Sequence, residues 1–409
     1  MVVYVDDFKL SGPVENLKKG WALLRKNLVI DKETGHGQYF GCGHDAGTFN
    51  MPDGSVAHSV SYNMESFWNS CVERYVELAG PNVRLKDVPT PFLVEDAEKG
   101  PAGAPCATGP ISECPWCAHT FSPKTYKDLA DLDRQTKKVV PTGPLLGSNE
   151  KPPGGGNSAA QQKPQIKGRL AEHAACILMK CLYGARMARF DLLRAITSLA
   201  CLLTRWTPEC DRKLHRLMCY IHTSKHLRMV GYVGNSLKEV EPHLFADADC
   251  AGCQTTQRST SGLHLCIRGT QTCFPIAGQS NRQGCVSHST PEAEIVAADF
   301  GLRLSGLPAL SLWHVLLPHQ PPLFFHEDNQ AMIHVVTTGR NPTMRYLHRT
   351  HRVSVSWLHE VCKRDDVVLM YEDSAKMAAD IYTKGFTDKA KWEQVCGLIN
   401  VIDPKFFER

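Results

Sequence analysis

The stretch HLFADADCAGC, residues 243–253, decides the fold because it places acidic side chains inside an apolar strand. Side chains alternate between the two faces of a strand, so Phe245, Asp247 and Asp249 are expected on one face. A buried carboxylate without a partner is unfavourable, and the strand therefore needs other groups beside its acids. The alternation does not by itself choose between Asp247 and Asp249.

The sequence after this strand predicts further strands and helices, several of which carry acids. Residues 259–278 contain two strands, and Ser289 or Thr290 caps a helix that has Pro291 in its first turn. Later segments predict an apolar strand, another helix, and a last strand followed by a helix. The acids on these elements are Glu292 and Glu294 on the capped helix, Glu327 and Asp328 at the end of the apolar strand, and Asp380 on the last helix.

Each of these acids alone has an ordinary structural explanation. Glu292 and Glu294 favour a helix N-terminus, and Asp328 suits an N-cap. Glu292 and Glu294 are two helical positions apart, roughly on opposite sides, so only one of them can face a common site. Together, the acids occur in a recurring order: first strand, following helix, end of the fourth strand, late helix.

This order, and the residues around each acid, resemble the ribonuclease H domain of Ty1/copia-type retrotransposon Pol polyproteins. The similar segments are FADADCAGCQTTQRSTSGLHL, SHSTPEAEIVAADFGL, EDNQAMIHV and MAADIYTKGF. The tetrapeptide YVDD, residues 4–7, resembles the reverse-transcriptase motif that precedes this domain in the same polyproteins. Residues 184–232 resemble the helical connection between the two, with Ala-Arg-Phe-Asp at 188–191 where the family typically has Thr-Arg-Pro-Asp. The resemblance covers roughly positions 1–60 and 170–388.

The resemblance implies an α/β (mixed α+β) fold class. We expect a ribonuclease H-like domain with a five-stranded mixed sheet and flanking helices, preceded by a truncated reverse-transcriptase palm/thumb remnant and a helical connection. By this resemblance, four acids would be catalytic and would hold two Mg²⁺ ions, with Mn²⁺ as a substitute: Asp247, Glu294, Asp328 and Asp380. The implied reaction is endonucleolytic hydrolysis of RNA in an RNA–DNA hybrid. The alternative is a non-catalytic transposon relic that only binds nucleic acid.

The acids Asp6 and Asp7 end an apolar strand close to Met1, and the local pattern predicts a hairpin with both acids at its bend. In the resembling family they would belong to the polymerase palm, whose third metal-binding aspartate lies far upstream. We therefore expect a remnant polymerase site at Asp6 and Asp7 that does not extend primers. The remainder of a Pol polyprotein is a possible partner.

Composition and the family resemblance together divide the chain into five expected segments. We expect a truncated reverse-transcriptase part at 1–97, a flexible Pro/Gly-rich linker at 98–167, the helical connection at 168–238, the ribonuclease H-like domain at 239–388 and a C-terminal tail at 389–409. Inside the linker, Cys114 and Cys117 have the C-x-x-C spacing of a zinc or redox site, with Cys106 and His119 as further candidate ligands. A zinc-binding adaptor is the third and weakest functional alternative.

A basic cluster follows the apolar strand, and its exposed cations suit the phosphates of a hybrid. Its members are Arg340, Arg345, Arg349 and Arg352, with His348 and His351 nearby. A solvated loop would have the same composition. Here the chain departs from the family, with Arg-Thr-His-Arg at 349–352 where Arg-Thr-Lys-His is usual. Cys250 likewise replaces the usual aromatic residue, which fits divergence or decay of a mobile-element copy.

The overall composition is that of a soluble globular chain. The 409 residues are 43% hydrophobic and 22% charged, and the net charge of +4 means that nucleic-acid binding must come from local patches. The 17 cysteines form no regular framework, which predicts reduced thiols and an intracellular location, cytoplasmic or nuclear. No secretory leader or long apolar run is recognised, so we expect neither secretion nor a membrane partner.

Overall fold

The computed structural model describes residues 1–94 and 166–407, together with the short strands β6 (Ser112–Glu113) and β7 (Thr120–Phe121). Six residues inside the long ranges are not described: Asp6, His36, Pro52, Gln254, Thr255 and Pro318. The expected polymerase-remnant acid Asp6 therefore lies outside the described residues. So do Cys106, Cys114, Cys117 and His119 of the candidate zinc or redox site.

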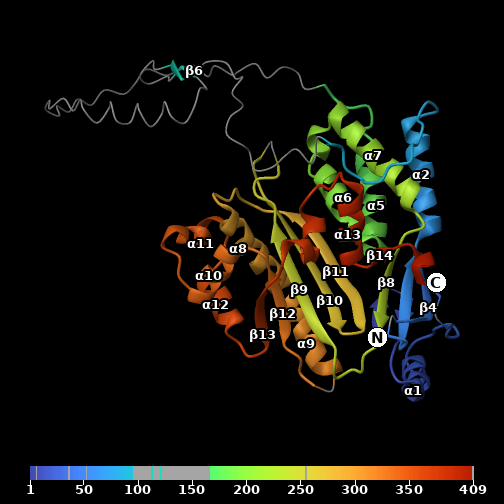
Figure 1. Cartoon of the computed structure of the whole chain (residues 1–409). Helices are drawn as coiled ribbons and strands as arrows, with labels where there is room; N and C mark the ends of the chain where they lie inside the picture. The colour runs from blue at the N-terminus through green and yellow to red at the C-terminus, as the bar shows by residue number, and fades with distance from the viewer. Residues whose placement is uncertain are drawn as a thin grey trace.

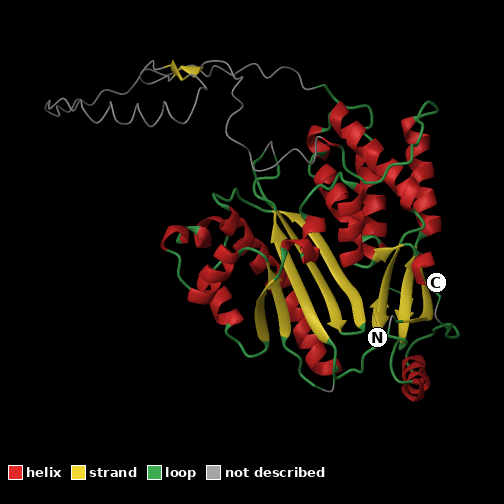
Figure 2. Ribbon diagram, in the orientation of Figure 1, coloured by secondary structure: helices red, strands yellow, loops and turns green. Residues whose placement is uncertain are grey.

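The fold is built on one large mixed sheet with helices packed around it (Figure 2). At one end of the sheet two strands pair in parallel with their neighbours, and every other pairing in this sheet is antiparallel. The strand order across the sheet is β13 (Val367–Tyr371), β12 (Leu323–Glu327), β9 (Glu241–Ala248), β10 (Thr260–Gly269), β11 (Thr272–Arg282), β8 (Arg228–Val233), β5 (Val56–Asn63), β4 (Cys42–Asn50) and β3 (Gln38–Tyr39), with β14 (Val401–Ile402) paired to β8.

The sheet has ten strands, so the expectation of a five-stranded sheet is wrong. The five expected strands are present side by side, but β11 also pairs with β8 and β8 pairs with β5. An uncovered edge would leave a row of unpaired backbone groups, and the added strands pair those groups. The segment before the linker is thereby joined to the same sheet as the C-terminal segment.

The helices gather in two places (Figure 1). Those near β12 and β13 are α8 (Thr290–Gly301), the π-helical turn η3 (Leu302–Gly306), α9 (Leu307–Leu316), α10 (Gln330–Thr338), α11 (Leu347–Thr350) and α12 (Val355–Cys362). Those at the other end are α2 (Glu65–Ala79), α5 (Ala174–Ala188), α6 (Leu193–Ala200), α7 (Pro208–Ser224) and α13 (Lys389–Leu398). The predicted start of α8 is confirmed, since the Ser289 side chain accepts a hydrogen bond from the Glu292 backbone and a proline lies in the first turn.

The largest hydrophobic cluster joins residues far apart in sequence. It extends from Cys42 to Val401 and includes the fully buried rings of Trp68 and Trp392. A second cluster lies between α8 and the strands β9, β10 and β12. Residues 389–407, set apart as a tail on composition, form α13, β14 and a final 3₁₀ turn. Trp392, Val395, Cys396, Ile399 and Val401 of this segment belong to the first cluster.

The predicted N-terminal hairpin is present, but Asp7 begins its second strand, and Asp6 lies outside the described residues. Strands β1 (Val2–Tyr4) and β2 (Asp7–Lys9) pair antiparallel as a separate two-stranded sheet, with Tyr4 opposite Asp7. Asp7 is exposed. A further helix, α1 (Val14–Arg25), follows.

One described helical run, Thr290–Leu316, is long and apolar enough to cross a membrane when judged by length and composition alone. Half of its most apolar window is buried inside the protein, and a core helix of a globular protein passes the same test.

Candidate metal centre

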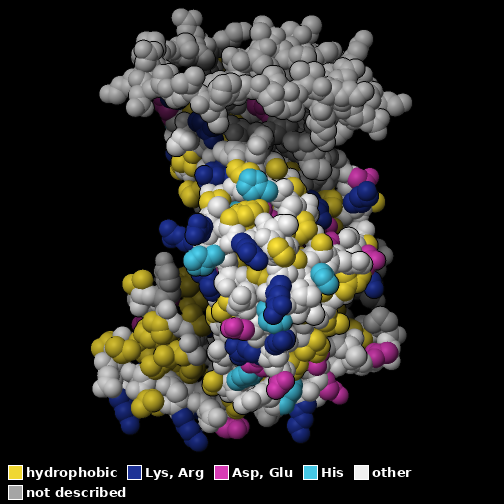
Figure 3. All heavy atoms as spheres, turned by 90° about the vertical axis from the view of Figure 1, so that its left-hand side faces the viewer, with side chains coloured by type: hydrophobic (Ala, Val, Ile, Leu, Met, Phe, Trp, Pro, Cys, Tyr) yellow, Lys and Arg dark blue, Asp and Glu magenta, His cyan; other side chains and the backbone are white. Residues whose placement is uncertain are grey.

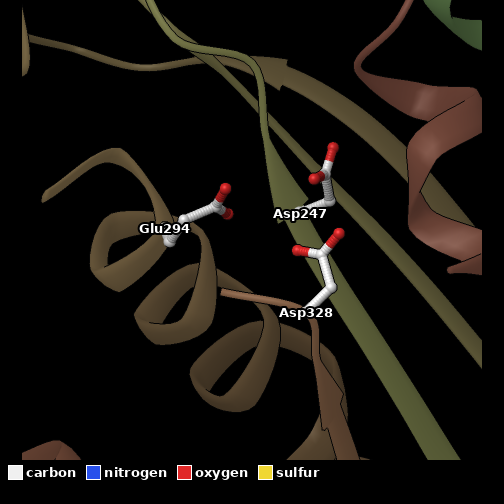
Figure 4. A group of neighbouring side chains, drawn as sticks. All are labelled: Asp247, Glu294 and Asp328. Atoms are coloured by element: carbon white, nitrogen blue, oxygen red, sulfur yellow. The ribbon is translucent and has the colours of Figure 1, made fainter. Parts of the chain in front are cut away.

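Three acidic side chains converge at one edge of the sheet. Asp247 comes from β9, Glu294 from α8, and Asp328 directly follows β12. Each offers a carboxylate oxygen, and these three oxygens lie within 4.8 Å of one another (Figure 4). Among the described residues no other cluster of histidine, cysteine or acidic side chains meets the same distance criterion.

The sheet topology explains why these residues meet. Because β9 and β12 are parallel neighbours, their carboxyl ends lie at the same edge, where Asp247 and Asp328 are found. Helix α8 packs across β9 and β10, and Gly301 lies in van der Waals contact range of Leu244 and Ala246. The capped first turn of α8 then directs Glu294 toward the strand ends (Figure 4).

The fourth expected acid, Asp380, is not part of this group of three. It lies in the 3₁₀ helix η6 (Ala378–Tyr382) and is joined to Asp247 through a cation. The Lys384 ammonium is 2.6 Å from Oδ1 of Asp380 and 3.5 Å from Oδ1 of Asp247. The structure thus brings three of the four acids together directly and the fourth through Lys384.

Segment 378–384 covers the sheet beside Asp247 because Gly262 leaves room for it. A Cβ atom at Gly262 would lie 2.7 Å from Thr383 Cγ2 and 2.9 Å from the Ala379 carbonyl oxygen. The Thr383 hydroxyl donates a hydrogen bond to Oδ2 of Asp247. This contact and Lys384 together fix both oxygens of Asp247.

Burial dominates the electrostatics of the centre. It raises the pKa of Asp247, although the Lys384 charge and the Thr383 hydrogen bond oppose that shift. Burial raises the pKa of Glu294 well above its ordinary value, and the neighbouring Asp247 charge raises it further. Burial and the Asp247 charge raise the pKa of Asp380 to about 8, again opposed by Lys384. Burial and neighbouring negative charges favour the protonated form of these carboxyl groups, and a bound cation would favour the ionised form.

Two buried oxygens near the centre have no hydrogen-bond partner among the described residues: Oε2 of Glu294 and Oε2 of Glu327. Glu294 is only 3% exposed and Glu327 is fully buried. A hard divalent cation such as Mg²⁺ or Mn²⁺ prefers oxygen ligands, and an unpaired buried carboxylate oxygen fits that preference. The residues present therefore suit a divalent cation at Asp247, Glu294 and Asp328.

The two ambiguous acids have partners of their own. Asp249 pairs with the Arg194 guanidinium of α6 at 3.0 Å and accepts a hydrogen bond from the Thr260 backbone. Glu292 points away from the centre and accepts hydrogen bonds from the Tyr346 hydroxyl at 2.6 Å and the His288 backbone at 2.9 Å. The prediction that only one of Glu292 and Glu294 faces the common site is confirmed.

A cavity of about 560 Å³ opens beside the centre, between α6, α7 and the loop after β9. Leu199 and Leu202 are among its apolar lining residues. Five basic side chains also line it: Arg194, Arg205, Lys213, Arg282 and Lys384. Three of these are paired to acids, Arg194 to Asp249, Lys213 to Glu209, and Lys384 to Asp247 and Asp380. A positively charged, partly apolar cavity suits the phosphates and bases of a nucleic-acid strand.

The predicted nucleic-acid-binding arginines lie within residues 340–352, here called the basic segment. All four are exposed, and none forms an ion pair with another described residue: Arg340, Arg345, Arg349 and Arg352. Figure 3 views the side of the molecule where α10, α11 and α12 lie, and Lys, Arg and His side chains gather there with a few acids among them. The basic segment is held to α8 by Tyr346 and by His351, whose Nε2 is 3.2 Å from Oε1 of Glu292.

Sequence reasoning missed the roles of Lys384, Thr383 and Glu327. Lys384 lies four residues after Asp380, a spacing that brings two side chains together on a helix, so its pairing had a sequence signal. Glu327 precedes Asp328 and, by strand alternation, lies on the same face of β12 as Phe325. Both side chains are fully buried. Thr383 had no such signal, because its contact with Asp247 depends on how segment 378–384 packs on Gly262.

Comparison with known proteins does not assign the chain to a family. No family model matches the chain, and no curated protein matches it.

Proposed function

We propose that this protein is a divalent-metal-dependent ribonuclease H, derived from a retrotransposon, that cleaves the RNA strand of RNA–DNA hybrids. The observation that carries the proposal is the convergence of Asp247, Glu294 and Asp328 around an unpartnered, buried Glu294 oxygen. The strand order β11-β10-β9-β12-β13, with β9, β12 and β13 parallel, supports the ribonuclease H-like reading of the fold.

The hybrid substrate is proposed on the motif resemblance, and two basic surfaces support it. The basic segment presents four exposed arginines, and the cavity beside Lys384 presents further cations close to the carboxylates. Cations on both sides of a centre can hold a nucleic-acid backbone in register across it. Contacts to phosphates carry no sequence information, which would suit an enzyme that acts on hybrids of any sequence.

In the proposed mechanism, Asp247, Glu294 and Asp328 would hold the cation. A bound divalent ion would supply an activated water and stabilise charge on the phosphate. The Thr383 hydroxyl donates a hydrogen bond to Asp247 Oδ2 and so restricts the rotation of this carboxylate. Glu294 must give up its proton to become a ligand, since burial favours its neutral form. Lys384 balances the negative charge between Asp247 and Asp380.

The test is a cleavage assay of the full chain on a labelled RNA–DNA hybrid, with Mg²⁺ and with a chelator. We expect Mg²⁺-dependent cuts in the RNA strand, and Asp247→Asn should reduce the rate by at least about 100-fold, since even residues that only orient metal ligands are worth 10–100-fold. Asp249→Asn is the matched control on the same strand face and should keep most of the activity. Loss of cleavage in Asp249→Asn but not in Asp247→Asn would show that the first ligand was assigned wrongly.

The second candidate is a relic that binds hybrids without cutting them. The Lys384 ammonium favours it, because a cation of the chain already partly neutralises Asp247 and Asp380. A purified chain that binds hybrid in a salt-sensitive way but shows no Mg²⁺-dependent cleavage would support this candidate against the nuclease.

A further inference from the structure

The Lys384 ammonium occupies a defined place between two carboxylates. It is 2.6 Å from Asp380 Oδ1 and 3.5 Å from Asp247 Oδ1, and its side chain is 41% exposed. The side chain is thus partly in contact with solvent while its ammonium lies between the two carboxylates. The short, charge-assisted contact with Asp380 fixes the position of the ammonium, and both carboxylates favour its charged form.

Asp247 takes part in two sets of contacts. Its Oδ2 accepts the Thr383 hydrogen bond, and its Oδ1 is 3.5 Å from the Lys384 ammonium. One of its oxygens also lies within 4.8 Å of carboxylate oxygens of Glu294 and Asp328. A cation that bridged Asp247 and Asp380 would have to share the position of the ammonium, and like charges about 4 Å apart repel strongly in a poorly solvated site.

We propose that the centre takes one divalent cation, at Asp247, Glu294 and Asp328, and that Lys384 supplies the second positive charge by occupying the place between Asp247 and Asp380. The inference refines the two-ion expectation for the site, and it rests on the metal-binding part of the proposed function. Lys384 is a positioning residue in this arrangement. It holds Asp380 beside Asp247 without a bound ion.

The structure explains why a lysine can take this place. Lys384 follows Thr383 directly, and the Thr383–Asp247 hydrogen bond anchors the backbone at the point from which the lysine side chain extends. Thr383 can lie this close to the sheet because position 262 is glycine, where a Cβ atom would be 2.7 Å from Thr383 Cγ2. A neutral side chain at position 384 would leave Asp247 and Asp380 facing each other without compensation, which creates a second cation site.

The experiment counts the Mn²⁺ ions bound by the full chain, using electron paramagnetic resonance of free Mn²⁺ and isothermal titration calorimetry. We expect one ion per chain in the unmodified protein, both alone and with a cleavage-resistant 2′-O-methylated RNA–DNA hybrid. Lys384→Ala should bind a second ion, whereas Lys384→Arg should still bind one. Lys389→Ala is the control, since the Lys389 side chain is 69% exposed and pairs with Glu393, away from the carboxylate centre.

Two ions bound to the unmodified protein would overturn the inference, and so would a single ion bound to folded Lys384→Ala. Should Lys384→Ala fail to fold, Lys384→Gln keeps most of the side-chain stem and is expected to bind two ions. Hybrid cleavage separates the two proposals. If the chain binds one ion but does not cut a hybrid, the one-ion inference stands and the proposed nuclease activity is wrong. If the chain cuts a hybrid and binds two ions, the nuclease activity stands and the one-ion inference is wrong.

Discussion

The Tyr346 hydroxyl donates a hydrogen bond to Oε2 of Glu292 at 2.6 Å, and this bond joins the basic segment to the helix that carries Glu294. Glu292 is fully buried, so its carboxylate depends on the few donors around it. The same hydrogen bond raises the pKa of Tyr346 to about 12, which keeps the phenol a neutral donor at physiological pH. The segment that carries the exposed arginines is thus joined by a hydrogen bond to α8, the helix that contributes Glu294 to the carboxylate centre.

Replacing Tyr346 by phenylalanine should weaken this link. Tyr346→Phe removes one donor from the buried Glu292 carboxylate, which costs about 1–3 kcal/mol of folding free energy. Because the basic segment loses its anchor, hybrid affinity should fall more than the rate of cleavage at saturating hybrid. Urea unfolding and single-turnover cleavage measure the two effects. Tyr371→Phe is the control, since Tyr371 is 55% exposed on β13. Equal effects of the two substitutions would contradict the proposed anchor.

The basic segment should contribute to binding mainly through phosphate contacts. Arg345→Ala and Arg349→Ala each remove an exposed cation, and each should lower the salt slope of log K by about 1 if it contacts a phosphate. Arg74→Ala serves as a matched control, because Arg74 lies on α2 and is paired to Glu77. Fluorescence anisotropy of a labelled hybrid across a series of salt concentrations measures the slope. Unchanged slopes in both segment variants would show that these residues form only a solvated loop.

The buried pair Arg189–Asp191 should be important for stability. Both side chains are at most 1% exposed, and Arg189 also donates to the Ser224 carbonyl. Asp191→Ala leaves a buried guanidinium without its anion, so we expect a loss of about 3–5 kcal/mol in urea unfolding. Glu77→Ala breaks an exposed pair and should cost about 0–1 kcal/mol. A similar, small cost for both variants would mean that water enters the site around Arg189.

Local sequence signals predicted much of the candidate site. The capped start of α8, the strand that carries Asp247 and the strand end at Asp328 all follow from nearest-neighbour chemistry such as capping, prolines and alternation. These signals do not depend on distant residues. The acids could therefore be placed on their elements, and only their convergence needed the folded chain.

What the sequence could not supply depends on contacts between distant segments. Pairing of β8 with β5 makes a ten-stranded sheet, and no local pattern in either strand specifies that partner. The position of the Lys384 ammonium likewise depends on segment 378–384 packing on Gly262, more than a hundred residues away. Periodicity describes which face a side chain occupies, but it does not state what lies opposite that face.

The carboxylate centre should make metal-free stability fall as pH rises. The Asp380 pKa is about 8 in the folded chain because of burial, and its ordinary value is 3.8. Between these values the folded state binds more protons than the unfolded state, so the free energy of unfolding decreases with pH. The buried groups Asp247, Glu294 and Glu327 shift in the same direction. Each such group contributes up to about 1.4 kcal/mol per pH unit.

The effect of the carboxyl groups on stability is best measured above pH 6.5, where buried histidines no longer contribute to the pH dependence of the free energy of unfolding. Burial lowers the pKa of His243 and His264 to about 3 and that of His326 to about 4, so these rings become protonated on unfolding only below that pH. From pH about 6.5 to about 8, we expect the melting temperature of the metal-free chain to decrease. Excess Mg²⁺ should raise it, and more at the upper end, because cations bind ionised carboxylates.

Thermal unfolding monitored by circular dichroism tests this pH dependence, with and without Mg²⁺. Asp380→Asn keeps the shape of a protonated acid but cannot ionise, so the metal-free pH slope of this variant should be shallower than that of the unmodified chain. Asp365→Asn is the control, since Asp365 is exposed. A melting temperature that does not fall with pH across this window without metal would contradict the prediction, because carboxyl groups already ionised in the folded chain give no such slope. A Mg²⁺ effect that is equal at both ends would show that the ion binds elsewhere.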